Sequence, residues 1–183
     1  MLNSKEIAKY FIAISDPQSG DEMTNLRLQK LLYFAQGCFL AKYHKPLFDE
    51  KIKSWKDGPV VPQVYHEYKN NGSNIISPMI DFDIDNLDED VRDMLDIVYY
   101  NFINYSAWRL REITHSHDIV NEAYQNKLNS GSDEIDVKKM EDFFLENFKE
   151  FIDGSEEDED KFLGEMALKR YNDPNMRYVK VEC

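Results

Sequence analysis

The segment THSHD, at residues 114–118, gathers two imidazoles, two hydroxyls and a carboxylate within five positions. Imidazoles and carboxylates are the usual ligands of zinc and the usual general bases of hydrolases, so His115, His117 and Asp118 are candidates for a metal-assisted hydrolytic site. Residues two apart in a helix point to different sides, however, and the spacing is not that of HExxH. In the alternative interpretation, which we favour, a hydroxyl of the segment caps the next helix and an imidazole holds a main-chain carbonyl group.

Other catalytic templates do not occur in the sequence. Neither GxSxG nor GxxxxGK[ST] is present, the seven glycines are scattered, and in a chain with 35 acidic residues any pair of carboxylates is uninformative. The two cysteines, Cys38 and Cys183, form no CxxC or Cys/His zinc pattern, which indicates a reducing compartment. The residues alone therefore favour no catalytic template, and the hydrolase built on His115, His117 and Asp118 stays an alternative.

The formal net charge of −13 is concentrated in two segments. Residues 81–96 hold eight acids and one Arg, and residues 131–160 hold thirteen acids and three Lys. Two acidic faces repel phosphate, which disfavours direct nucleic-acid binding and favours a basic protein partner, although such acids can also simply solvate helix surfaces. The first ten residues lack an apolar leader and no apolar run reaches eighteen residues, so we expect a cytoplasmic protein without a membrane partner.

Helical periodicity predicts a mainly α fold, a single compact domain of about seven helices. The most regular apolar stripes run from Leu28 to Phe39 and from Val91 to Ile103, and we expect these two helices at the centre. A small β element is predicted near residues 51–56 and 75–84, where KIKSW could pair with an alternating apolar segment. Further helix starts are predicted at Ser4, Pro62, Ser106, Ser116 or Asp118, and Asp136, the last with Val137, Met140, Phe144, Phe148 and Phe151 on one face.

A domain boundary is predicted after residue 152. The segment GSEEDED and the preceding Asp153 place six acids between residues 153 and 160, which interrupts the helical pattern. We therefore expect one domain over residues 1–152 and an acidic linker with a C-terminal tail over residues 153–183.

The nonamer SWKDGPVVP is the most specific local signal. Gly58 can adopt backbone angles that other residues avoid, Pro59 restricts the residue before it, and Trp55 is a large apolar anchor. The residues alone do not decide whether Trp55 faces the core or a partner, and the core is our expectation. Tyr65 and Tyr68 share the next short helix, where both rings cannot easily face inward, so they are candidate contact residues.

The longer segment LRLQKLLYFAQGCFLAKYHKPLFDEKIKSWKDGPVVPQVYHEY resembles the signature region of the Panacea antitoxin family, which includes SocA-type proteolytic adaptors and phage-associated proteins. The resemblance is close over residues 24–68. Downstream, LREITHSH at residues 110–117 and MEDFF at residues 140–144 are similar to later segments of the family, which extends the resemblance to roughly residues 25–150. One departure follows the Thr-His pair, where the family tends to have Pro-Trp and this chain has residues 119–121, IVN.

The resemblance implies a mostly helical antitoxin that neutralises a cognate toxin by direct binding, with no catalytic residues and no cofactor, or a SocA-type variant that delivers the toxin to an AAA+ protease. Residues 153–183 lie outside the resemblance, and we expect this acidic segment to be the part that would contact such a protease. Two alternatives remain open, an acidic phage or mobile-element inhibitor of a host nucleic-acid-handling protein and the metal-assisted hydrolase described above. The predicted partner-binding or signature residues are Trp55, Gly58, Pro59, Val60, Pro62, Tyr65, Tyr68, Thr114 and His115.

Overall fold

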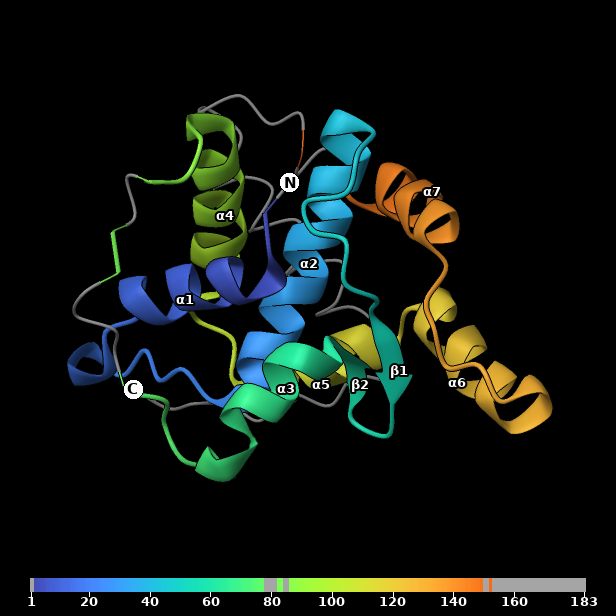
Figure 1. The fold of residues 1–183 in the computed structure, drawn as a ribbon, viewed down its shortest axis with the longest axis horizontal. Coiled ribbons are helices and arrows are strands. Elements are labelled where there is room, and N and C mark those ends of the chain that lie inside the picture. Colours follow the sequence, from blue (N-terminus) through green and yellow to red (C-terminus); the bar gives the residue numbers. More distant parts are fainter. Residues whose placement is uncertain (1, 78–81, 84–85, 150–151, 153–183) are drawn as a thin grey trace, which may run out of the picture.

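The computed structural model describes residues 2–77, 82–83, 86–149 and 152 of the chain (Figure 1). Within these ranges it contains seven α-helices and one two-stranded sheet, which confirms the predicted mainly α fold. The elements in chain order are α1 (Ser4–Ile14), the 3-10 turn η1 (Pro17–Ser19), α2 (Asn25–Tyr43), β1 (Lys53–Trp55), β2 (Gly58–Val60), α3 (Pro62–Tyr68), the 3-10 turn η2 (Lys69–Asn71), α4 (Glu89–Phe102), α5 (Ala107–His115), α6 (Asp118–Ser130) and α7 (Val137–Asn147).

Helix α2 is the centre of the fold, as its apolar stripe predicts. Helices α1, α3, α4, α5 and α7 and strand β2 all pack against it, so that nearly every residue between Asn25 and Ala41 is buried (Figure 1). The Thr24 side chain caps its start by accepting a hydrogen bond from Arg27 N at 3.3 Å, and His44 ends it with a left-handed backbone at φ 54°. A helix covered on all sides has no polar face, and its buried polar residues therefore need partners inside the protein.

Among the other α-helices, α1, α5 and α7 have side-chain caps, whereas the starts of α3, α4 and α6 make no side-chain capping hydrogen bond. Ser106 and Asp136 cap α5 and α7 as expected. Helix α1 is capped by Asn3 instead of Ser4, because Asn3 and Glu6 form a reciprocal capping box. Helix α6 begins at Asp118, one of the two predicted starts.

Strands β1 and β2 form an antiparallel hairpin in which Lys53 lies opposite Val60 and Trp55 opposite Gly58. The prediction that β1 pairs with residues 75–84 is wrong for the described part of that range, since Ile75 forms its bridge with Thr24. A two-residue loop closes the hairpin locally, which costs less chain entropy than a pairing across twenty residues. Residues 78–81 and 84–85, including the predicted Ile80 and Ile84, lie outside the described residues.

Helix α7 completes an aromatic cluster beside α2. Phe144 and Phe148 are stacked with their ring centroids 4.6 Å apart, and Phe34 of α2 is 6.3 Å from Phe144. Gly37 makes this approach possible, because a Cβ atom there would collide with the Phe144 ring. Val137, predicted on the buried face of this helix, is half exposed at 50% because it is the first residue of the helix, and Phe151 lies outside the described residues.

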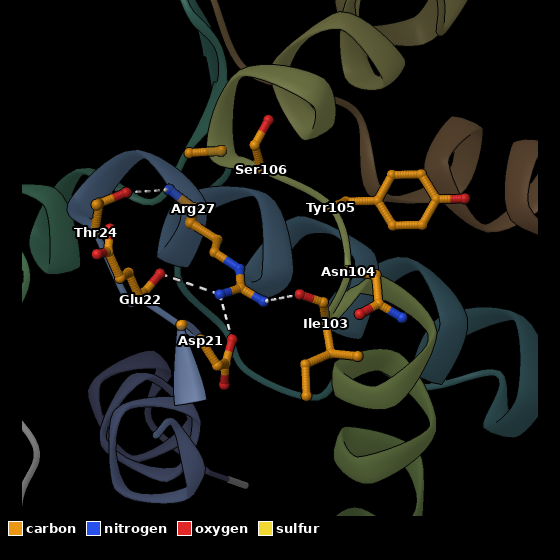
Figure 2. Close-up of a pocket in the computed structure, with 10 residues that line it drawn as sticks. Asp21, Glu22, Thr24, Arg27, Ile103, Asn104, Tyr105 and Ser106 are labelled. Carbon is orange, nitrogen blue, oxygen red and sulfur yellow. Dashed lines mark hydrogen bonds and ion pairs between the residues drawn. The ribbon is translucent and has the colours of Figure 1, made fainter. Parts of the chain in front are cut away.

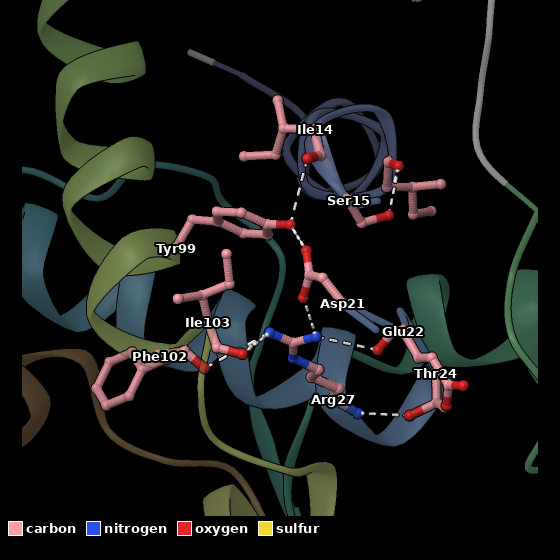
Figure 3. Close-up of polar contacts among 10 residues, drawn as sticks. Ile14, Ser15, Asp21, Glu22, Thr24, Arg27, Tyr99, Phe102 and Ile103 are labelled. Atoms are coloured by element: carbon pink, nitrogen blue, oxygen red, sulfur yellow. Dashed lines mark hydrogen bonds and ion pairs between the residues drawn. The ribbon is translucent and has the colours of Figure 1, made fainter. Parts of the chain in front are cut away.

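A buried ion pair joins α2 to the loop before it, and both of its side chains also contact α4 or the residue that follows it (Figure 3). The Arg27 guanidinium contacts the Asp21 carboxylate, which also accepts a hydrogen bond from the Tyr99 hydroxyl. Arg27 donates further to the main-chain oxygens of Glu22 and Ile103, both at 3.0 Å. Because both charged side chains are almost fully buried, the pair depends on these additional contacts.

Nowhere in the described ranges does a helix have the length and apolar composition that crossing a bilayer requires. The predicted domain boundary after residue 152 and the acidic segment beyond it, residues 153–183, lie outside the described residues.

Candidate functional site

The GPVVP sequence runs from β2 of the hairpin to the start of α3, and polar side chains of α2 form hydrogen bonds with the main chain around it. Lys30 is fully buried and its Nζ donates to Pro59 O at 3.0 Å. The Gln29 amide oxygen accepts from Val61 N at 2.8 Å, and Asn25 donates to Tyr65 O at 3.1 Å. These contacts fix the main chain of β2 and of α3, so the central helix positions both the hairpin and α3.

Helix α5 closes the other side of the hairpin. The loop residue Asp57 pairs with Arg111 at 2.8 Å, and His115 Nε2 lies 3.0 Å from Lys56 O. Gly58 has a φ of 93°, and a Cβ there would lie 2.9 Å from Thr114 Oγ1 and 3.0 Å from Lys30 Nζ. Glycine is therefore required at this point both by its backbone angle and by the lack of space.

The two histidines of THSHD serve different parts of the molecule. His115 has both ring nitrogens beside main-chain oxygens, Nδ1 at 2.7 Å from Arg111 O and Nε2 beside Lys56 O. His117 is buried, with Nδ1 2.9 Å from the Tyr33 hydroxyl and its ring against Phe143. Within the described ranges, no group of three or more His, Cys, Asp or Glu side chains could hold a metal ion. As the structural interpretation predicts, an imidazole of the segment, that of His115, lies against main-chain carbonyl oxygens. The predicted capping hydroxyl is wrong, because Thr114 and Ser116 donate back to main-chain oxygens of α5 and no side chain caps α6.

The aromatic residues of the hairpin and of the following helix α3 lie at the surface. Trp55 and Tyr65 are both partly buried and contact each other edge to face, with ring centroids 5.0 Å apart, and His66 adds a third ring 6.3 Å from Trp55. Neither Trp55 nor Tyr65 belongs to the buried core cluster, so the expectation that Trp55 faces the core is wrong. The reason is the hairpin register, since Ser54 takes the inward position and donates to Val120 O at 2.8 Å. We call Trp55, Tyr65 and His66 the hairpin aromatic surface.

The remaining predicted residues divide by burial. Pro62 starts α3 as predicted and is partly buried, as is His115. Tyr68 is only 9% exposed, which makes it a packing residue of α3 and leaves it little surface for a partner. Gly58, Pro59, Val60 and Thr114 are also buried.

Sequence reasoning missed the residues that hold the hairpin and the start of α3 in place, namely Asn25, Gln29, Lys30, Asp57 and Arg111. The signal was present for two of them, because Gln29 and Lys30 interrupt the apolar run of the central helix. It also missed Trp108, which is 64% exposed and stacks on Arg111 with 5.4 Å between the guanidinium carbon and the ring centroid.

The buried amine of Lys30 should make stability depend on pH. Burial lowers the pKa of Lys30 from 10.5 to about 7, with Arg111 acting in the same direction and Asp57 against it. Between pH 7 and 9 the unfolded chain keeps the lysine proton that the folded protein loses, so the free energy of unfolding should rise by about 2 kcal/mol. Urea denaturation across this range would measure the rise, and Lys30→Met should abolish it. An equal rise in Lys30→Met would assign it to another group.

A pocket of about 500 Å³ lies apart from the hairpin, between the loop before α2 and the α4–α5 connection (Figure 2). Its lining includes Arg27 of the buried ion pair, and on the opposite side Asn104 and Ser106.

Comparisons with known proteins place the hairpin within a matched region. Residues 28–120 match the family model described as "Antitoxin SocA-like, Panacea domain". The chain is also 36% identical over 104 residues to Antitoxin SocA of Caulobacter vibrioides, an alignment that covers 51% of this chain and 55% of the relative. The match therefore spans about half the length of that relative. No solved structure matches the chain significantly. Helix α2 from Leu28, the hairpin and α5 all lie in the matched region.

Proposed function

Because the chain belongs to the family of SocA-like antitoxins with a Panacea domain, we propose that it neutralises a cognate toxin by binding it directly through the hairpin aromatic surface. The observation that carries this proposal is the partly exposed pair of Trp55 and Tyr65 on a hairpin that buried polar contacts fix in place. The proposal gives the protein a binding role without catalysis, and it places both proteins in the cytoplasm.

The chemistry of the surface suits a protein partner. Tryptophan and tyrosine are enriched among the residues that contribute most to protein–protein binding, and rings with few rotatable bonds lose little entropy on contact. Lys30 and Gln29 fix the main chain of the hairpin in the free protein, so binding a partner should cost little conformational entropy there. Trp108 extends the aromatic character beyond the hairpin loop, because the Arg111 on which it stacks also pairs with Asp57.

The charge distribution supports a basic toxin. The first turns of α4 expose Asp88, Glu89, Asp90 and Asp93, whereas several acids near α7 are paired with lysines, as in Lys139–Glu122 and Lys53–Asp133. Within the described residues, the start of α4 therefore presents an exposed acidic face. Such a face would steer a positively charged partner and make its association rate fall with added salt.

Removing the Trp55 ring should weaken toxin binding and leave the protein folded. Trp55→Ala should weaken the complex with the toxin by about 2 kcal/mol or more, the scale of an interface hot spot, while the melting temperature changes little because Trp55 lies outside the core. The toxin to use is the product of the neighbouring reading frame, with affinity measured by calorimetry and neutralisation by co-expression.

Tyr100→Ala is the matched control, because Tyr100 is an aromatic residue of α4 with 63% exposure that does not belong to the hairpin. It should bind as the wild type does. Unchanged binding in Trp55→Ala, or an equal loss in both variants, would reject the hairpin aromatic surface. Failure of the wild-type protein to bind or neutralise the toxin would reject the antitoxin role itself.

We further propose that the protein delivers the toxin to an AAA+ protease, with residues 153–183 as the segment that contacts the protease. Deleting residues 153–183 should leave toxin binding intact and slow toxin turnover in the cell to the rate seen without the antitoxin. A pulse-chase measurement of toxin half-life, together with a binding assay on the truncated protein, would test both parts. Turnover that is unchanged by the deletion would limit the function to masking the toxin.

A further inference from the structure

A second cavity, which we call the α7 cavity, opens between the segment before β1 and the start of α7, and its volume is about 210 Å³. The apolar side chains that line it include Phe48, Ile52, Ile135, Val137 and Met140. Pockets that enclose a drug-sized ligand usually measure about 300 Å³ or more. The α7 cavity is therefore suited to a single inserted side chain.

The interior of the α7 cavity favours an apolar occupant. Its buried polar side chain, Gln36, already uses both ends of its amide, because Nε2 donates to Phe48 O and Oε1 accepts from Leu47 N and Phe48 N. Val137 stands at the mouth with 50% exposure, whereas the other apolar side chains named above are at most 4% exposed. An apolar side chain that entered here would remove the exposed surface of Val137 from water.

The rim of the α7 cavity carries more negative than positive charge. Asp49, Glu50 and Glu134 line it together with one base, Lys51. Lys51 pairs with Glu134 at 2.7 Å, and Asp49 is exposed and makes no ion pair within the described part of the chain. An apolar side chain with a cation beside it is therefore attracted here, and one with a carboxylate beside it is repelled.

The α7 cavity lies close to the hairpin aromatic surface. Lys51 at the rim and Trp55 are four residues apart, so their Cα atoms are separated by at most about 14 Å. Exposure alternates between them, with residues 52 and 54 buried and residues 51, 53 and 55 facing outward. One short segment of a partner can therefore contact Trp55 and enter the cavity on the same side of the chain.

We propose that the α7 cavity receives a leucine or methionine side chain of the toxin, from a segment in which lysine or arginine flanks that side chain. The inference rests on the proposed function and gives the toxin a second contact beside the hairpin aromatic surface. The apolar lining selects the inserted side chain, and the acidic rim selects the residues next to it.

The first test is an NMR titration of the full chain, labelled with ¹³C in the methyl groups of Ile, Val and Met, with the peptide acetyl-Lys-Lys-Leu-Lys-Lys-amide. The methyl signals of Ile135, Val137 and Met140 should shift and approach saturation. Two control peptides, one with serine in place of the leucine and one with glutamate in place of every lysine, should cause smaller shifts at the same ionic strength. The proposal is overturned if the leucine peptide shifts none of these signals or shifts them no more than the controls do.

The second test measures toxin binding by calorimetry. Val137→Lys removes apolar surface at the mouth and adds a charge that repels a basic segment, so it should weaken the complex about tenfold or more. Leu128→Lys is the matched control, because Leu128 is a 70% exposed residue of α6 and the charge change is the same. It should bind the toxin as the wild type does. Both positions are exposed, so both variants should keep the wild-type melting temperature.

The outcomes separate this inference from the antitoxin role. If Trp55→Ala weakens the complex and Val137→Lys binds as Leu128→Lys does, the inference is overturned and the antitoxin role stands. If the wild type does not bind the toxin, the antitoxin role fails, and with it the toxin as occupant. A second copy of the chain is the occupant if the methyl signals shift with protein concentration, and residues 153–183 are the occupant if deleting them shifts the signals. Either result would overturn the proposal.

Discussion

Replacing Arg27 with Met should lower the free energy of unfolding by about 3–5 kcal/mol. The change leaves the Asp21 carboxylate almost fully buried beside the Tyr99 hydroxyl, and it removes the donor from three main-chain oxygens, those of Glu22, Phe102 and Ile103. Leaving a charge buried without its partner costs more free energy than the ion pair itself contributes. Arg27→Met should therefore destabilise the protein more than the loss of a surface ion pair does. Urea denaturation at neutral pH is the measurement.

Two comparisons make the result specific to the buried pair. Lys138→Met removes an exposed lysine that pairs with Glu141 and Asp142, and it should cost far less stability than Arg27→Met because solvent screens these pairs. The double variant with Asp21→Asn and Arg27→Met no longer buries a lone charge and should be more stable than Arg27→Met alone. If Arg27→Met lost no more stability than Lys138→Met, Asp21 would not be buried as the structure shows.

Truncating Phe144 to Ala should cost about 3–5 kcal/mol, because this fully buried ring stacks on Phe148 and contacts Tyr33 and Phe34 of the central helix. Its removal opens a cavity between α2 and α7 that the surrounding rings can fill only in part. The same denaturation experiment would measure the loss, and near-ultraviolet circular dichroism would report the loosened aromatic packing.

Gly37 provides a matched test of this contact. Gly37→Val should itself destabilise the protein by about 1–3 kcal/mol, because its side chain collides with the Phe144 ring. In the double variant of Gly37→Val and Phe144→Ala the new methyl groups occupy the space of the lost ring, so the two losses should not add. Additive losses would mean that the helices already separate at this point in the wild type.

Features that depend on neighbouring residues could be predicted from the sequence. Thr24, Ser106 and Asp136 cap their helices because a short polar side chain reaches the amides two or three positions on, and such contacts need no knowledge of the fold. The turn at Asp57 and Gly58 and the helix start at Pro62 follow from the same kind of local chemistry. The central position of α2 followed from the apolar stripe between Leu28 and Phe39.

The polar contacts of the site could not be predicted in this way. Lys30 meets Pro59, and Asn25 meets Tyr65, only because the chain returns across α2 after the hairpin. The direction of Trp55 depends on the register with Gly58, and a shift of one residue would turn its ring to the other face. Sequence periodicity does not contain that register, because the strand has only three residues.

The way the hairpin is anchored has a consequence for how relatives with this architecture can diverge. Lys30, Gln29 and Gly58 fix the main chain from inside the protein, whereas Trp55 and Tyr65 lie outside the core and support little else. If the hairpin aromatic surface binds the toxin as we propose, substitutions at these two positions can alter partner choice without endangering the fold, and substitutions at the anchoring positions cannot. On that proposal, the residues that fix the fold and the residues that choose the partner are different, so relatives could change their toxin while they keep the same scaffold.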